Sequence, residues 1–159
     1  MMLAQLQFVK DGFDPASGVE SVLLKEAEAQ DKSFGFLETS ALRIEIFEGM
    51  SMESQIQFLV DGALTLDITE PMLDSITDEW ADGDVEGLGT IISNPDIAGG
   101  SEFYDGLFVR RNKHWVPQIE AMLDEPGTFM VAVGAGHLAG PDSVIKMLED
   151  NGHTLTRTQ

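Results

Sequence analysis

The sequence predicts an α/β fold that is rich in helices and has a small mixed or parallel sheet ending in a C-terminal βαβ unit. Three observations lead to this prediction. An apolar run at residues 129–133 stops in a glycine-rich loop, as a buried strand does. A helical pattern and a second strand pattern follow that loop, in the order of a βαβ unit. Residues 40–123 keep helical spacing of apolar side chains. At 159 residues, we expect one domain.

The composition excludes several classes of partner and chemistry. Asp and Glu number 28 against 9 Lys and Arg, which gives a formal net charge of −19. Such a surface repels phosphate backbones and anionic lipids, so we expect no nucleic acid and no membrane contact, and we interpret the acidity as a solvated surface. The absence of cysteine excludes disulfides, thiolate zinc sites and cysteine nucleophiles. No apolar run approaches the ~20 residues that span a bilayer.

The first part of the chain is predicted to hold a turn, a helix and a strand. Residues 11–15 cluster turn-forming side chains, and Ser17 with Glu20 has the spacing of a capping box for a helix over 19–29. The apolar residues of 34–39 then predict a short strand that ends in polar side chains.

A series of helices is expected in the middle of the chain, because apolar residues recur there every three or four positions and capping residues or a proline precede them. Their predicted spans are 40–48, 52–63, 70–80, 85–92 and 101–123. Pro117 removes a backbone donor from the last of these helices, so we expect a kink or a fresh helix start between residues 113 and 117.

The last part of the chain predicts the βαβ unit. A strand over 128–133 leads into the glycines around His137, a helix follows from 142 to 150, and a final strand spans 153–158. Because the carboxyl ends of parallel strands meet at one edge of a sheet, we expect His137 and Glu38 to emerge there together.

His137 is the first candidate for chemistry. Gly134 and Gly136 before it allow backbone angles or close approaches that a Cβ would obstruct. With Glu38, His137 suggests a metal or acid–base site, but a catalytic metal commonly has three protein ligands and the spacing supplies two. A structural, hydrogen-bonding histidine is the favoured alternative. The glycine pattern also matches part of a dinucleotide loop, yet it lacks the ribose-binding acid that should follow ~20 residues later on a second strand.

Arg111 is the second candidate, because its spacing from Leu107 and Trp115 places it on the apolar stripe of the long helix. An unpaired guanidinium is very costly to bury, so we expect Arg111 to be substantially buried and paired with an acidic group, with Glu38 as the first choice. A purely structural ion pair and a role in a site both stay open.

Short motifs follow one another along the chain: Gly12-Phe-Asp14, Phe36-Leu-Glu-Thr39, Arg111-Asn112 with Trp115 and Ile119, Val131 to Gly140, and Gly152-His-x-Leu. Together they resemble the TraB/GumN family, to which the Tiki metalloproteases are related. The most specific motif is Gly134-Ala-Gly-His137, which is similar to the Gly-x-x-His motif of that family. The resemblance extends over almost the whole chain.

This resemblance implies a metal-dependent, protease-like hydrolase that acts on a peptide or protein. The metal would be a divalent ion such as Mn, Co or Zn, with His137 and Glu38 as ligands. The resemblance implies catalytic roles for His137, Glu38 and Arg111, and supporting roles for Gly134, Gly136, Asn112 and Asp14. Family members begin with a secretion signal or membrane anchor, then a first Gly-x-x-His motif and an acidic residue, and this sequence shows none of them.

These departures predict that residues 1–159 form a single domain that is incomplete on its N-terminal side, the carboxyl-terminal two-thirds of such a protein, and inactive alone. The alternative is a non-catalytic cell-envelope or ligand-binding domain of the same family. The resemblance implies the periplasm or cell envelope in either case. Since missing strands would leave a sheet edge open, we also expect self-association as a dimer.

Overall fold

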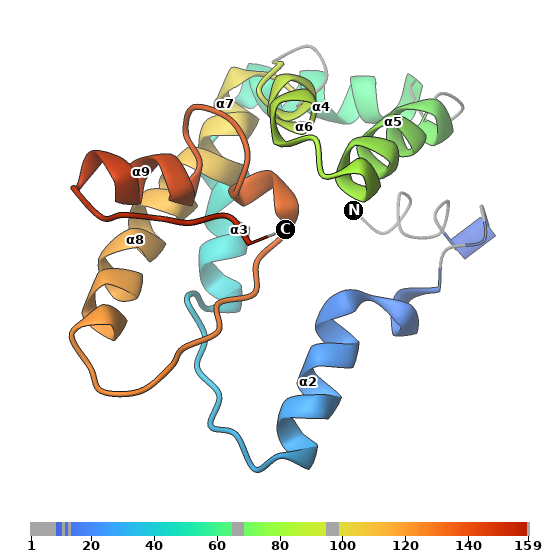
Figure 1. Ribbon diagram of the computed structural model, residues 1–159. Coiled ribbons are helices and arrows are strands. Elements are labelled where there is room, and N and C mark those ends of the chain that lie inside the picture. Colours follow the sequence, from blue (N-terminus) through green and yellow to red (C-terminus); the bar gives the residue numbers. More distant parts are fainter. Residues whose placement is uncertain (1–8, 11, 13, 65–68, 95–98, 159) are drawn as a thin grey trace.

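The computed structural model describes residues 9–158 except 11, 13, 65–68 and 95–98. The described chain is a set of helices joined by turns and extended segments (Figure 1). In chain order the elements are η1 Pro15–Ser17, α2 Val19–Ala29, α3 Ser40–Glu48, α4 Met52–Leu64, α5 Thr69–Asp82, α6 Val85–Ile92, α7 Ser101–Tyr104, η3 Asp105–Val109, α8 Arg110–Leu123, η4 Ala135–His137 and α9 Val144–Asp150.

The predicted α/β fold is wrong, because the described residues contain helices and no strand. No ladder joins the segments that were predicted as strands, namely 34–39, 128–133 and 153–158. The predicted sheet and βαβ unit are therefore wrong as well. A strand exists only when a neighbouring chain accepts and donates its backbone hydrogen bonds, and apolar composition cannot supply that neighbour.

The predicted helices are largely confirmed, whereas the capping box expected for one of them is not. Helix α3 has Thr39 as its N-cap and ends at Gly49. Helix α2 follows Gly18 with no side-chain cap, so the capping box expected for it is wrong. Ser17 instead donates its hydroxyl to Asp14, whose carboxylate caps η1. No helix in the described part of the chain is both long and apolar enough to cross a membrane.

The long helix predicted from residue 101 is interrupted, but not where the proline predicts. Helix α8 continues through Pro117, and the irregular turn is the π-helical segment η3 between α7 and α8. Gly106 of η3 is buried against α3, where a Cβ would lie 2.9 Å from Ile46 Cγ2. The prediction missed this turn because its cause is a close contact between helices rather than a local breaker. π-Turns frequently accompany functional sites, and Arg111 lies in the first turn of α8, which follows η3.

The core lies between α8 and α9, and it is formed by Trp115, Val116, Val144 and Leu148. Burying each side chain of this size contributes roughly 1.5–3 kcal/mol. Each of the three extended segments packs one residue against this core, namely Leu37, Val133 and Leu155. The core therefore fixes the ends of two segments that carry candidate site residues, since Leu37 precedes Glu38 and Val133 precedes the turn at His137.

Helix α6 is held against the chain that follows His137. Gly89 of α6 is buried, and a Cβ on it would lie 2.8 Å from the backbone nitrogen of Gly140. Only a glycine allows the two backbones to approach so closely. Gly140 itself has φ +84, a conformation that side chains other than glycine rarely adopt. This contact positions α5 and α6 beside the histidine turn.

Candidate functional site at His137

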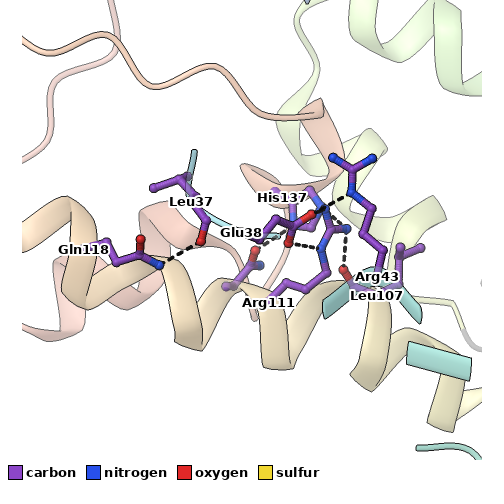
Figure 2. Close-up of polar contacts among 8 residues, drawn as sticks. Leu37, Glu38, Arg43, Leu107, Arg111, Gln118 and His137 are labelled. Atoms are coloured by element: carbon purple, nitrogen blue, oxygen red, sulfur yellow. Dashed lines mark hydrogen bonds and ion pairs between the residues drawn. The ribbon is translucent and has the colours of Figure 1, made fainter. Parts of the chain in front are cut away.

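Three elements bring the predicted site residues together, as Figure 2 shows. The 3-10 turn η4 ends in His137, the first turn of α8 supplies Arg111 and Asn112, and the segment before α3 supplies Glu38. Gln118 of α8 donates a hydrogen bond of 2.9 Å to the carbonyl of Leu37, which holds the Glu38 segment against α8.

Both ring nitrogens of His137 are hydrogen-bonded. Nε2 lies 3.0 Å from Arg111 Nη1, and Nδ1 lies 2.7 Å from Asn112 Oδ1. A guanidinium can only donate, so Nε2 is the acceptor and Nδ1 carries the proton that it donates to Asn112. The amide of Asn112 fits this assignment, because its Nδ2 donates to the carbonyl of Asp142 at 2.7 Å. The two neighbours therefore fix one neutral tautomer of the imidazole.

The surroundings of His137 keep the ring uncharged. The residue is only 6% exposed, and its ring lies against Trp115 and Phe108 at centroid distances of 4.4 and 5.0 Å. Burial first, and then the positive charge of Arg111, lower the pKa of His137 to about 4, although the charge of Glu38 opposes them. At neutral pH the imidazole is a lone-pair acceptor at Nε2.

Arg111 joins His137 to Glu38 through a two-point ion pair. Arg111 Nε donates to Glu38 Oε2 at 2.9 Å and Nη2 donates to Oε1 at 2.8 Å. The two side chains are 15% and 7% exposed, so the expected burial of Arg111 and its pairing with Glu38 are confirmed. Arg111 Nη1 also donates to the Leu107 carbonyl, and the guanidinium lies 4.8 Å from the centroid of the Trp115 ring.

Glu38 stays ionised because two arginines surround it. Burial by itself would raise the pKa of this carboxyl group, but the hydrogen bonds and charges of Arg111 and Arg43 hold the pKa below its ordinary value. Arg43 Nε donates to Glu38 Oε1 at 3.1 Å, while its own side chain is 67% exposed. No pattern in the sequence predicts the contact of Arg43 with Glu38, because the five-residue spacing crosses the start of a helix.

This arrangement does not fit a metal between His137 and Glu38. The Nε2 lone pair of His137 and both carboxylate oxygens of Glu38 face the Arg111 guanidinium, a cation that occupies the place of the ion. Nor does any group of three His, Asp or Glu side chains gather among the described residues in a way that could hold a metal. With two potential ligands, both already bonded, a transition metal would stay mostly hydrated.

The remaining predicted site residues have separate places. A Cβ on Gly136 would lie 2.9 Å from Ile92 and from the Phe108 ring, so this glycine permits a close approach, as expected. Gly134 has φ −58, and a Cβ on it would lie 3.9 Å from His137 Cδ2, an ordinary van der Waals contact, so the special backbone angle or close approach expected at Gly134 is not observed. Asp14 is not brought to His137, because its carboxylate accepts from the backbone of Ala16 and caps η1, which precedes α2.

Fold and site together define a helical domain in which a glycine-rich turn delivers a neutral histidine to a buried arginine–glutamate pair. The chain belongs to the TraB/PrgY/gumN family, whose family model matches residues 1–157. The family indicated by the motifs around Glu38, Arg111 and His137 is thereby confirmed.

Two curated proteins, both named Uncharacterized protein YbaP, are similar to this chain. The protein from Escherichia coli (strain K12) is 30% identical over 153 residues, which cover 93% of this chain and 54% of YbaP. The protein from Shigella flexneri matches with the same identity and coverage. The chain thus spans about half the length of these relatives. No solved structure matches it.

Proposed function

We propose that this chain carries part of the site of a protease-like hydrolase of the TraB/PrgY/gumN family, and that it is inactive alone. The observation that supports the proposal is the state of His137. Its imidazole is neutral, Asn112 holds it in one tautomer, and its Nε2 lone pair accepts a hydrogen bond from Arg111 Nη1. The metal dependence of the whole protein is part of the proposal, with ligands other than His137 and Glu38, because Arg111 bonds to the lone pairs of both residues.

In this proposal His137 and Arg111 act on a substrate when their mutual hydrogen bond opens. Nε2 then accepts a proton from the attacking water, while Asn112 keeps the ring oriented through Nδ1. Arg111 Nη1 becomes available to donate to the oxygen that gains negative charge in the transition state. Because the charge of Arg111 lowers the pKa of His137, its movement toward substrate also strengthens the base. Glu38 keeps Arg111 charged and aligned.

The expected result for this chain alone is weak or absent binding of Mn, Co and Zn, because the guanidinium of Arg111 meets both potential ligands. Isothermal titration of the chain and of His137→Ala measures it, since the variant reveals how much of any signal comes from the acidic surface. Micromolar binding that disappears in His137→Ala would show a third ligand and contradict the assignment of an incomplete site.

Catalysis is tested in a longer protein that adds a Gly-x-x-His segment before this chain. We expect it to bind the metal and to hydrolyse a quenched fluorescent peptide, and His137→Gln to lower kcat roughly a hundredfold or more through loss of the base. Arg110→Lys, next to Arg111 but outside the network, serves as the control with unchanged rate. Equal hydrolysis by His137→Gln would exclude His137 from the reaction.

The alternative is a non-catalytic cell-envelope or ligand-binding domain, and one observation favours it. Every hydrogen-bonding atom of the Glu38 carboxylate, the Asn112 amide and the His137 ring already has a partner, as in a purely structural network. The longer protein distinguishes the two functions. A hydrolase cleaves the peptide and loses this activity in His137→Gln, whereas a non-catalytic domain does not cleave the peptide in either form. A location in the periplasm or cell envelope is part of both proposals.

Self-association as a dimer is a further proposal, although its original ground, an open sheet edge, is absent from the described residues. The extended segment at 128–133 exposes Phe129 and Met130 beside the exposed Leu123. Apolar side chains gathered in this way favour burial against a second copy. Sedimentation velocity should show a dimer that dissociates in Met130→Glu, whereas a concentration-independent monomer of the unchanged chain would exclude it.

A further inference from the structure

A hollow of about 270 Å³ lies beside the histidine turn and has no part in the network around His137. Helix α5 forms one wall with Trp80 and Thr77, and α6 forms the opposite wall with Leu88 and Ile92. The floor is Gly136, the residue immediately before His137.

The floor of this hollow is fixed and touches the candidate site. Gly136 packs so closely on Ile92 and Phe108 that a Cβ would lie 2.9 Å from each side chain. Phe108 in turn lies against the ring of His137. Since the contact between Gly89 and Gly140 holds α6 on the same turn, the hollow and the site keep one geometry relative to each other. A group bound in the hollow would sit one residue from the imidazole.

The size and lining of the hollow select an apolar group. Leu88 is buried at its base, whereas Trp80 is 55% exposed and Thr77 is exposed, so these two residues form an open mouth. A dry apolar cavity of ~150 Å³ accommodates benzene, and this hollow is larger. A leucine or phenylalanine side chain therefore fits, and an indole face at the mouth favours contact with it. The Thr77 hydroxyl can bond to the backbone that carries the side chain.

Charge around the hollow selects what lies next to that apolar group. Neither α5 nor α6 contains Lys or Arg. Arg157 lies near the link between these helices and donates a hydrogen bond to the carbonyl of Gly83 there. Carboxylates are numerous on the two helices and their link: Asp74, Asp78, Glu79, Asp82, Asp84 and Glu86. Their summed field attracts a basic group and repels an acidic one.

We propose that the hollow between α5, α6 and η4 binds one leucine- or phenylalanine-sized side chain of a peptide, with a basic residue favoured beside it. This inference rests on the proposed function, because it names part of the substrate of that site. It concerns binding and not hydrolysis, so the inference about the hollow and the proposed hydrolase function can be contradicted separately.

The test uses three dipeptide probes on the chain as it is: acetyl-Leu-Lys-amide, acetyl-Gly-Lys-amide and acetyl-Leu-Glu-amide. Amide shifts of Thr77 and Gly136 in NMR titrations report binding. We expect the Leu-Lys probe to bind about tenfold more tightly than the Gly-Lys probe, because a buried leucine side chain supplies the difference. The Leu-Glu probe should bind more weakly than Leu-Lys at low salt, and the gap should shrink as salt is added.

Variants of exposed residues locate the bound probe without disturbing the core. Thr77→Phe, which closes the mouth, and Trp80→Ala, which removes its aromatic wall, should each weaken Leu-Lys binding about tenfold. Leu123→Ala is the matched control, since Leu123 is also exposed and lines a second hollow of about 310 Å³ near Phe129. This variant should bind Leu-Lys as the unchanged chain does.

The opposite results overturn the inference. Equal affinity for the Leu and Gly probes would show that the hollow takes no side chain, and loss of binding in Leu123→Ala alone would move the site to the second hollow. Equal affinity for Leu-Lys and Leu-Glu would remove the preference for a basic neighbour. Side-chain binding in this chain without hydrolysis in the longer protein would overturn the proposed function and leave the peptide pocket standing.

Discussion

Replacing Arg111 by methionine is expected to lower the free energy of unfolding by about 3 kcal/mol. The change removes both hydrogen bonds to Glu38 and leaves that carboxylate mostly buried with Arg43 as its remaining partner. Orphaning a buried charge costs roughly 3–5 kcal/mol, and the exposed Arg43 keeps the cost near the lower end. The acceptor at His137 Nε2 also loses its donor. Urea denaturation followed by far-UV circular dichroism measures the difference.

Arg110 supplies the control, because it is the neighbouring residue of the same type on the same helix. Its side chain is 46% exposed and pairs with Asp105, which is exposed as well. Surface ion pairs contribute ~0–1 kcal/mol, so Arg110→Met should change the free energy of unfolding by that amount. If Arg111→Met lowers the free energy of unfolding by no more than Arg110→Met does, the pair with Glu38 contributes no more than a surface contact.

A double-mutant cycle assigns the loss to the pair itself. Glu38→Gln removes the charge whose buried partner Arg111→Met deletes, so the double variant should be more stable than the sum of the two single changes predicts. A coupling of about 2 kcal/mol is expected for groups in direct contact. Independent, additive losses would place the cost of Arg111→Met in the packing of its aliphatic stem on Trp115 instead.

The ion pair could be predicted from the sequence because its cause is local. A charged residue four positions from Leu107 and four from Trp115 has to lie on the buried stripe of a helix, and burial demands a partner. The identity of the partner has no such local cause, since Glu38 lies far away along the chain. The hydrogen bond from His137 to Asn112 has no signal of its own in the sequence, because it depends on where η4 meets α8.

The sheet could not be predicted correctly, because the apolar run at 129–133 has the composition of a buried strand without a partner. The composition of a segment determines how favourably it packs against an apolar neighbour. Whether a ladder of backbone hydrogen bonds forms depends on the presence of a second strand beside it. In the structure, Val133 packs on the core while Phe129 and Met130 stay exposed. The same reasoning explains η3, where the contact of Gly106 with Ile46, and not a local breaker such as Pro117, marks the irregular turn.

Between pH 6.5 and 4.5 the free energy of unfolding is expected to fall by about 2 kcal/mol, and His137 should account for the fall. Its pKa is about 4 in the folded chain, against an ordinary value of 6.5. In this window the unfolded chain therefore binds a proton that the folded chain does not, so acid favours unfolding. The contribution is fully present above pH 6.5 and is lost as the pH falls from there through 4. Complete loss of the contribution of His137 lowers the free energy of unfolding by about 3 kcal/mol.

The window isolates His137 from the other shifted groups. Glu38 has a lowered pKa, so its contribution is lost below its ordinary value of 4.5, and the lowered pKa values of Asp14, Glu102 and Glu120 act in that same acid range. The pKa of Tyr104 is raised to about 12, and the pKa of Lys146 is raised as well. These two groups therefore change the free energy of unfolding only at alkaline pH.

Urea denaturation at a series of pH values checks this expectation with two matched variants. His137→Gln keeps a hydrogen-bonding side chain but cannot titrate, so most of the fall in stability between pH 6.5 and 4.5 should be absent from it, even if its stability is lower throughout. His114→Gln changes an exposed histidine on the same helix as Arg111 and should keep the slope of the unchanged chain. A slope that survives in His137→Gln would mean that the imidazole is protonated in the folded state, and the fixed neutral tautomer between Arg111 and Asn112 would then be wrong.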